Sequence, residues 1–144
     1  MGFLLLIVAV LLTSLVGSFA IVFTLFYYVI TLRFKALLRA LDGFFYTLAL
    51  SIDQLGNVLC AVPFQYIFTK GDNALKFGNP DDTVSYVIAI NQKRGTLTGM
   101  GKALAWVLDF VDKDHLQKAI NNKIKADYEA TLRLRNYEYY DRVH

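Results

Sequence analysis

Cysteine is almost absent from this sequence, because Cys60 is the only one among 144 residues. A single thiol excludes an internal disulfide and any metal site built from several cysteines. Free cysteine usually behaves as a small buried apolar side chain, and we expect Cys60 to lie buried within a helix. The chain also lacks internal repeats and low-complexity segments, which excludes a repeat architecture.

Charge is missing altogether from the first 32 residues, which contain no Asp, Glu, Lys, Arg or His. A helix needs ~20 apolar residues to cross the ~30 Å hydrocarbon core of a bilayer. This stretch is longer, and its few polar side chains are hydroxyls that can bond back to helix carbonyls. Residues 1–32 are therefore predicted to form one transmembrane helix. A hairpin bent at Gly17 and Ser18 is the alternative, but each of its arms would be too short to cross.

The same stretch differs from a cleaved signal peptide, which has a basic start and a shorter apolar run of ~7–15 residues. Nothing basic follows Met1, so we expect an uncleaved anchor. Arg33, Lys35 and Arg39 come directly after the apolar run. Because positive residues usually stay in the cytoplasm, we expect the inner membrane of a bacterial host, with the N-terminus outside and residues 33–144 in the cytoplasm.

The part after Leu32 holds all 15 basic and all 12 acidic residues, and the net charge is +3. So small a surplus does not form the dense basic stripe of a nucleic-acid-binding surface, and no nucleic-acid partner is expected. This part is long enough for one small domain but not for two.

Residues 33–60 are predicted to form one long amphipathic helix, because apolar residues recur at alternating spacings of four and three, the rhythm of a packing seam. Three interpretations stay open. The seam packs in an intramolecular bundle, which we favour, or pairs with a second copy in a homo-oligomer, or lies in the membrane interface with the three basic residues at the headgroups. The seam consists of Phe34, Leu38, Leu41, Phe45, Leu48, Ile52, Leu55 and Leu59.

Residues 61–78 are predicted to form an apolar connector, because Pro63 removes a backbone donor and crowds the preceding turn, which ends the long helix. The connector is unusually rich in aromatic residues. We expect it to cover the core of the domain. The alternative is that Phe64, Tyr66 and Phe68 dip to the bilayer surface.

Residues 79–144 are predicted to form three cytoplasmic helices. Asn79 is a good N-cap and Pro80 fits the first helical position, so the first helix is expected to start there and to run to about Gln92. Asp81 and Asp82 would then lie in the first turn, where the helix dipole favours acids. The β-branched residues that follow favour a strand instead, but the cap chemistry favours the helix.

The next segment, Gly95–Ala103, nearly matches a phosphate-binding loop. Its glycines are one residue too far apart and Ala103 replaces the required Ser or Thr, so nucleotide binding is not expected. Lys93–Gly95 is predicted to be a turn, and Thr98 to cap the second helix. The apolar face of that helix is expected to comprise Met100, Ala103, Leu104, Val107, Leu108 and Val111.

The last helix is expected to be capped by Asp112, with Asp114 in its first turn. His115 stands beside these carboxylates without a second histidine nearby, so we interpret it as a local hydrogen-bonding residue and predict no metal site. The helix carries a narrow apolar stripe that consists of Leu116, Ile120, Ile124, Tyr128 and Leu132.

Several short motifs follow one another in the middle of the chain, including Asp53-Gln54-Leu55-Gly56-Asn57 and Asp114-His115. Over roughly residues 40–120 the pattern resembles a group of small proteins of tailed bacteriophages and prophages. In that group, Leu-Asp-x-x-x-Asn precedes Gly-x-Pro-Asp-Glu-Thr-Ile-Ser and a later Phe/Leu-Asp-x-x-His-Cys. Here Asp82 replaces the Glu, and Leu116 stands where Cys is frequent. The motif residues, to which the resemblance assigns no role, are Asp53, Asn57, Gly78, Pro80, Asp81, Asp82, Thr83, Ser85, Arg94, Gly95, Asp109, Asp114 and His115.

Together these patterns predict an all-α protein with one N-terminal transmembrane helix followed by a small helical bundle. We expect a phage-type accessory protein that is anchored in a lipid bilayer, binds an unknown protein partner, and has no catalytic activity and no cofactor. One alternative is a membrane-permeabilising, holin-like protein that oligomerises through the span and the seam. Another is a metal-dependent hydrolase, which would need side chains converging within a few Å, namely Asp81, Asp82, Asp114 and His115.

Overall fold

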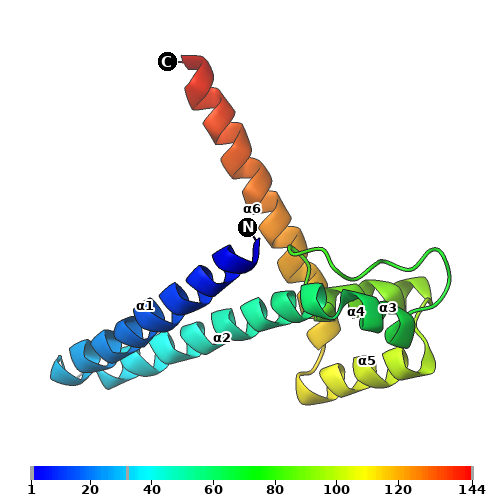
Figure 1. The fold of residues 1–144 in the computed structure, drawn as a ribbon, viewed down its shortest axis with the longest axis horizontal. Coiled ribbons are helices and arrows are strands. Elements are labelled where there is room, and N and C mark those ends of the chain that lie inside the picture. Colours follow the sequence, from blue (N-terminus) through cyan, green and yellow to red (C-terminus); the bar gives the residue numbers. More distant parts are fainter. Residues whose placement is uncertain (1, 32, 144) are drawn as a thin grey trace. The chain divides into compact units, whose positions relative to one another are not determined.

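The computed structural model describes the backbone of residues 2–31 and 33–143, and the side chains of residues 4–31 and 33–135 (Figure 1). Over this part of the chain the elements are all helices, and no strand is present. The predicted all-α class, with an N-terminal helix long enough to span a membrane, is confirmed. The helices are α1 (Gly2–Ile30), α2 (Phe34–Leu59), α3 (Ala61–Phe68), α4 (Val84–Arg94), α5 (Gly99–Val111) and α6 (His115–Val143).

The chain divides into two compact units, a first unit (Met1–Leu48) and a second unit (Ala49–His144). In the first unit, α1 continues through Gly17 and Ser18, which excludes the hairpin alternative. Its stretch Leu4–Ile30 has a mean hydropathy of 2.7 and none of its apolar window is buried, so this helix could cross a membrane. The hydroxyls bond back to helix carbonyls as expected, for example Ser18 Oγ to the Ser14 carbonyl oxygen at 2.6 Å.

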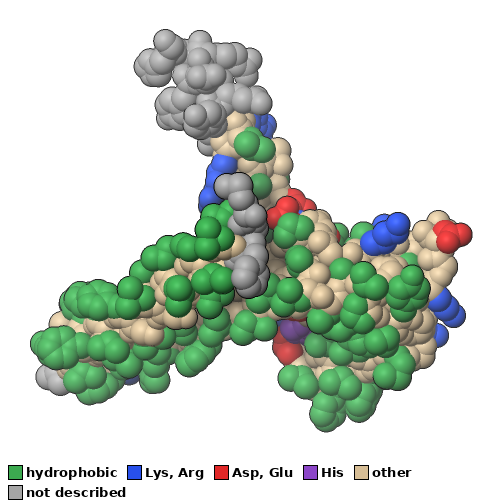
Figure 2. Space-filling view, in the orientation of Figure 1, with side chains coloured by type: hydrophobic (Ala, Val, Ile, Leu, Met, Phe, Trp, Pro, Cys, Tyr) green, Lys and Arg blue, Asp and Glu red, His purple; other side chains and the backbone are tan. Residues whose placement is uncertain are grey.

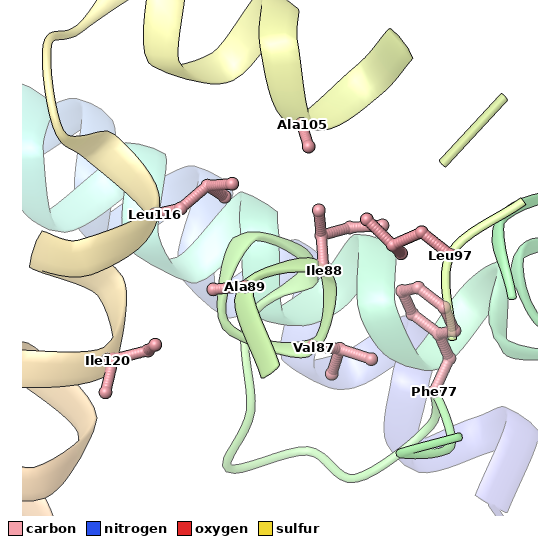
Figure 3. Packing of buried hydrophobic residues seen from close by; sticks show 8 residues of the cluster. All are labelled: Phe77, Val87, Ile88, Ala89, Leu97, Ala105, Leu116 and Ile120. Atoms are coloured by element: carbon pink, nitrogen blue, oxygen red, sulfur yellow. The ribbon is translucent and has the colours of Figure 1, made fainter. Parts of the chain in front are cut away.

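The core of the second unit forms around α4 (Figure 3). Val87 and Ile88 of α4 are fully buried. Side chains from α5, α6 and the segments before and after α4 surround them, and burying each such side chain stabilises the fold by ~1.5–3 kcal/mol. The core cluster consists of Phe77, Val87, Ile88, Ala89, Leu97, Ala105, Leu116 and Ile120.

The segment that was predicted to be a connector, residues 61–78, begins with a helix, α3. It is therefore not an irregular loop over its whole length. Pro63 does end the long helix, because its ring crowds the carbonyl of Leu59, where α2 stops. Pro63 then lies in the first turn of α3, where a missing N–H costs nothing. α2 and α3 are bent by 84° at this break. Cys60 lies at the break and is only half-buried, not buried within a helix.

The aromatic residues of α3 divide between core and solvent. Phe64 and Phe68 pack together with Phe77, with ring centroids 5.1 Å apart between Phe64 and Phe68 and 5.6 Å apart between Phe64 and Phe77. These rings cover the core, as predicted. Tyr66 does not, because its side chain is 81% exposed.

α4 begins later than predicted. Its N-cap is Thr83, whose hydroxyl accepts the Tyr86 N–H, and not Asn79. Pro80 and the two aspartates therefore belong to a turn that precedes the helix. The helix ends where the predicted turn lies, because Gly95 adopts the left-handed conformation with φ of 70° and glycine does so without a steric penalty.

Thr98 caps α5 as predicted, by accepting the Gly101 N–H. The predicted apolar face of this helix is only partly correct, because Leu104 and Leu108 of that face pack against the core. Gly101 and Ala105 are the buried positions, whereas the exposed fractions of Met100, Val107 and Val111 are 63%, 45% and 79%. A Cβ on Gly101 would lie 2.2 Å from the carbonyl oxygen of Phe68, so the backbone itself approaches α3 here.

The start of α6 also differs from the prediction. Asp112 is the C-cap of α5 and not the N-cap of α6, and Asp114 precedes the helix with a φ of 60°. Only the first two residues of the predicted stripe, Leu116 and Ile120, are buried, since Ile124 and Tyr128 are each 62% exposed.

Candidate functional site

The polar side chains of α2 connect this helix to the chain segment that leads into α4. Asp53 Oδ1 accepts the Val84 N–H at 3.1 Å, and its Oδ2 accepts the Ser85 N–H at 3.4 Å and the Ser85 hydroxyl at 2.9 Å. The first N–H groups of a helix have no partner within the helix, and a negative charge is favourable there. Asp53 thus caps α4 from another helix.

Asn57 is fully buried one turn after Asp53 and fixes the turn before α4. Its Nδ2 donates to the carbonyl oxygens of Asn79 at 2.8 Å and Asp82 at 2.9 Å, and its Oδ1 accepts the Gly78 N–H at 3.1 Å. Gly78 has a φ of 111°, a conformation that favours glycine. This one amide therefore satisfies three backbone groups of a non-helical segment.

Asp82 is buried and paired with a lysine of α6. Its Oδ1 lies 3.2 Å from Lys123 Nζ, and its Oδ2 accepts from Asn79 Nδ2 at 2.9 Å. Lys123 also lies 3.0 Å from Asp127. Burial opposes the charged form of Lys123, but its hydrogen bonds to Asp127 and Asp82 outweigh this effect and raise its pKa above the usual 10.5.

His115 links the network to the end of α5. Its Nε2 lies 3.1 Å from Ser85 Oγ and its Nδ1 lies 3.2 Å from Asp112 Oδ2. The Ser85 hydroxyl has one proton and donates it to Asp53, since a carboxylate only accepts. In the tautomer that carries its proton on Nε2, the ring donates to Ser85 Oγ.

Asp112 has a second partner, because Lys118 Nζ also binds its carboxylate. The hydrogen bond from Lys118, and after it the one from His115, hold the pKa of Asp112 below its usual value of 3.8. Asp112 is itself half-exposed, so this pair lies at the surface end of the network.

The order Asp112–His115–Ser85 is similar to the contacts of a Ser–His–Asp hydrolase triad, but the details favour a structural role. A catalytic serine gives its proton to the histidine, whereas Ser85 gives it to Asp53. Ser85 is 6% exposed, so a substrate has little access to it. Its backbone N–H also bonds to Asp53 and is not free to stabilise an oxyanion.

The motif residues thus fall into two groups according to their position in the structure. Asp53, Asn57, Gly78, Asp82, Ser85 and His115 converge in one network, and we name this group of six the polar network. The remaining motif residues lie at element boundaries. Thr83 caps α4, Gly95 ends it, Asp109 Oδ1 accepts the Leu116 N–H at 3.0 Å, and Arg94 donates to the Asn73 carbonyl oxygen at 3.1 Å. Pro80, Asp81 and Asp114 are exposed.

The four residues of the hydrolase hypothesis do not form one cluster. Asp82 binds Lys123 and Asn79, while His115 binds Asp112 and Ser85. Among the described residues, no group of three or more His, Cys, Asp and Glu side chains could hold a metal ion.

Sequence reasoning missed the roles of Asp112, Lys123 and Asn91. Asn91 is a second fully buried amide, and it exchanges hydrogen bonds with the backbone of Leu75 at 2.8 and 2.9 Å. A signal for Asp53 and Asn57 was present, because polar residues four apart share one face of a helix. No local signal identifies their partners, which lie more than 20 positions away in the sequence.

Besides α1, two further apolar surfaces are exposed among the residues that the structure describes. Figure 2 shows hydrophobic side chains gathered over α5, where the exposed fractions of Trp106 and Phe110 are 66% and 75% and their rings stack at 5.3 Å. Together with Met100, Val107 and Val111 these residues form the α5 patch. The second surface is the seam of α2, in which every residue except Leu41 is exposed. The core of the second unit is built around α4, and its cluster includes no seam residue.

Comparison with known protein families, with curated protein sequences and with solved structures finds no significant match.

Proposed function

We propose that the chain is a membrane-anchored interaction protein, in which α1 crosses a bilayer and the second unit binds a protein partner. The observation that carries the proposal is α1, a helix of membrane length with exposed apolar side chains along its described part. The shared motif supports a phage or prophage origin. The basic residues after the span support an inner-membrane location with the second unit in the cytoplasm.

The polar network supports binding rather than catalysis. Its side chains hold backbone groups and one another, and no described buried side-chain nitrogen or oxygen lacks a hydrogen bond. A catalytic group must come within hydrogen-bond reach of a substrate, and the buried Ser85 hydroxyl offers a substrate little access. The network therefore shapes the second unit and leaves recognition to its surface.

The α5 patch is the proposed binding surface. Aromatic residues and methionine are enriched at protein interfaces, and a few residues, among which tryptophan is enriched, contribute most of the binding energy. Lys102 and Lys113 are exposed on or directly after the same helix. The chemistry favours a protein partner with an apolar surface that is flanked by acidic residues.

A photoreactive residue placed at Phe110 of the full chain, expressed in a bacterial host, tests this function. We expect a discrete protein adduct, and we expect the Trp106→Ala change to reduce its yield. The control position is Lys125 on α6, which is exposed and polar and should give no adduct. Adducts with lipid alone, or equal adducts from both positions, would contradict the proposal.

The exposed seam favours membrane permeabilisation as a second candidate function. Oligomers that open a membrane need a helix surface that is not already used within one chain, and α2 offers such a surface. Induction of the full chain would then collapse the membrane potential, which a voltage-sensitive dye reports, whereas a chain starting at Arg33 would not. Full tolerance of strong expression would end this candidate.

A further inference from the structure

The face by which α2 joins the second unit is polar. Asp53 and Asn57 lie on that face and bind the segment before α4. Ile52, Leu55 and Leu59 of the same helix remain exposed, at 59%, 55% and 73%. The apolar side of α2 is thus not the side that holds the domain together, and it is free for another partner.

The exposed face is too wide for a simple two-stranded seam. At ~100° per residue, the seam residues together with Leu37 and Phe44 cover an unbroken arc of ~120° without a charged residue. We name these ten residues the α2 apolar face. In a coiled coil the positions beside the seam carry the charges that select the partner. Here those positions include only Lys35 and Asp42 as charged residues.

The covalent chain places the start of this face beside the proposed span. From Ile30, where α1 ends, to Phe34, where α2 begins, the chain reaches at most ~14 Å. A helix that crosses the bilayer therefore delivers the first turn of α2 to the headgroup region. Arg33, Lys35 and Arg39 are exposed in that region of the chain and suit anionic headgroups, each contributing ~1 kcal/mol near such a surface.

We propose that the α2 apolar face lies in the interface of the same bilayer that α1 crosses, between the headgroups and the acyl chains. α2 is then a second, in-plane attachment, with its basic residues at the headgroups and Asp53 and Asn57 turned toward the domain. An apolar face that is rich in Phe and Leu, bordered by basic residues, is typical of interfacial helices. This inference rests on the proposed membrane anchoring by α1.

Spin labels on the full chain test the inference, in a Cys60→Ser background and in vesicles of mixed neutral and anionic phospholipid. Phe45→Cys and Ile52→Cys place labels on the α2 apolar face. Thr47→Cys and Gln54→Cys are the matched controls, two residues further along and ~200° around the helix. Collision with oxygen and with a water-soluble nickel complex measures the depth of each label.

We expect the labels at Phe45 and Ile52 to collide more with oxygen than with nickel, at a depth of ~5–10 Å, and the controls to show the reverse. Labels shielded from both reagents, with dipolar broadening that unlabelled chain dilutes, would show a second copy on the face and overturn the inference. Labels equally accessible to nickel at all four positions would also overturn it.

Flotation of the same vesicles separates this inference from the proposed function. If the chain floats with the vesicles while the labels at Phe45 and Ile52 stay in water, α1 anchors the chain and only the in-plane attachment fails. If the chain does not float, the membrane anchoring fails and the inference fails with it.

Discussion

At the scale of single residues, buried side-chain amides form the backbone hydrogen bonds that regular secondary structure provides elsewhere in the chain. The segment between α3 and α4 has no helix or strand to satisfy its backbone groups. Asn57 and Asn91, both fully buried, provide the missing partners. Because leaving buried donors or acceptors without partners costs ~1–3 kcal/mol each, these two positions should tolerate substitution poorly.

Asn57→Ala gives the most direct test of this role. The change leaves the Gly78 N–H and the Asn79 and Asp82 carbonyl oxygens without their partner, and we expect a loss of ~3 kcal/mol or more in the free energy of unfolding. Chemical unfolding of the full chain in detergent micelles measures it. Gln92→Ala, at an exposed position of α4, is the control and should change stability by less than ~0.5 kcal/mol. Equal midpoints for the two variants would refute the role assigned to Asn57.

Asp112 makes stability depend on pH in a defined direction. Lys118 and then His115 hold its pKa below 3.8 in the folded chain. A carboxyl group with a lowered folded pKa stabilises fully above its unfolded value, and this stabilisation is lost as the pH falls through the folded pKa. We expect Asp112→Asn to lower the unfolding midpoint at about pH 6, and to lower it less at about pH 2.5, where protonation of Asp112 weakens the pairing. A difference that is the same at both pH values would contradict the pairing.

At the scale of elements, the sequence predicted which helices exist better than where they begin or which side they bury. Thr98 and Gly95 act locally, and both were placed correctly. The Asn79-Pro80 signal was overridden because Asp53, from another helix, satisfies the first N–H groups at Val84 and Ser85. A propensity rule cannot anticipate a cap that comes from a distant segment.

The sequence-based prediction of the buried face of α5 was also partly wrong, and the physical reason is similar. Hydrophobic spacing favoured Met100, Val107 and Val111, but the helix approaches α3 through Gly101, and its other buried position is Ala105. Close contact between backbones requires small residues, and these carry little hydrophobic signal. The larger apolar side chains are then left for the surface, which is how the α5 patch arises.

Gly101→Ala tests this explanation. The new methyl group would lie 2.2 Å from the Phe68 carbonyl oxygen, so α3 and α5 must separate, and we expect a loss of ~1–3 kcal/mol in the free energy of unfolding. Gly99→Ala is the matched control, because nothing lies within 4 Å of its Cβ position. Urea unfolding of both variants should separate them clearly. A Gly101→Ala chain as stable as the Gly99→Ala chain would show that the backbones do not meet here.

At the scale of the whole molecule, the length and uniform apolarity of residues 1–32 predicted a spanning helix without any tertiary information. The polar network could not be predicted in the same way, because its members come from α2, the turn before α4, α4 itself and α6. Their joint presence in one motif pattern indicated that they matter. Only the fold shows that they meet, and that Ser85 and His115 bond to one another and to Asp53 and Asp112.

The proposed orientation in the membrane rests on three basic residues that follow α1 in the sequence. Arg33, Lys35 and Arg39 lie within ~15–20 residues of the span, the range in which basic residues set topology. A fluorescent protein that matures only in the cytoplasm, fused after the last residue, should therefore be bright. Replacing all three basic residues by Gln should reduce its brightness and raise the activity of a periplasmic phosphatase fused at the same place.

The control for this experiment carries the same loss of charge elsewhere. Lys76, Lys102 and Lys113 are exposed and lie beyond the range in which basic residues set topology, so their replacement by Gln should leave both reporters unchanged. If both triple variants alter the reporters equally, net charge and not position governs insertion. A phosphatase fusion that is already active on the unmodified chain would reverse the proposed orientation and place the α5 patch, and any partner it binds, outside the cytoplasm.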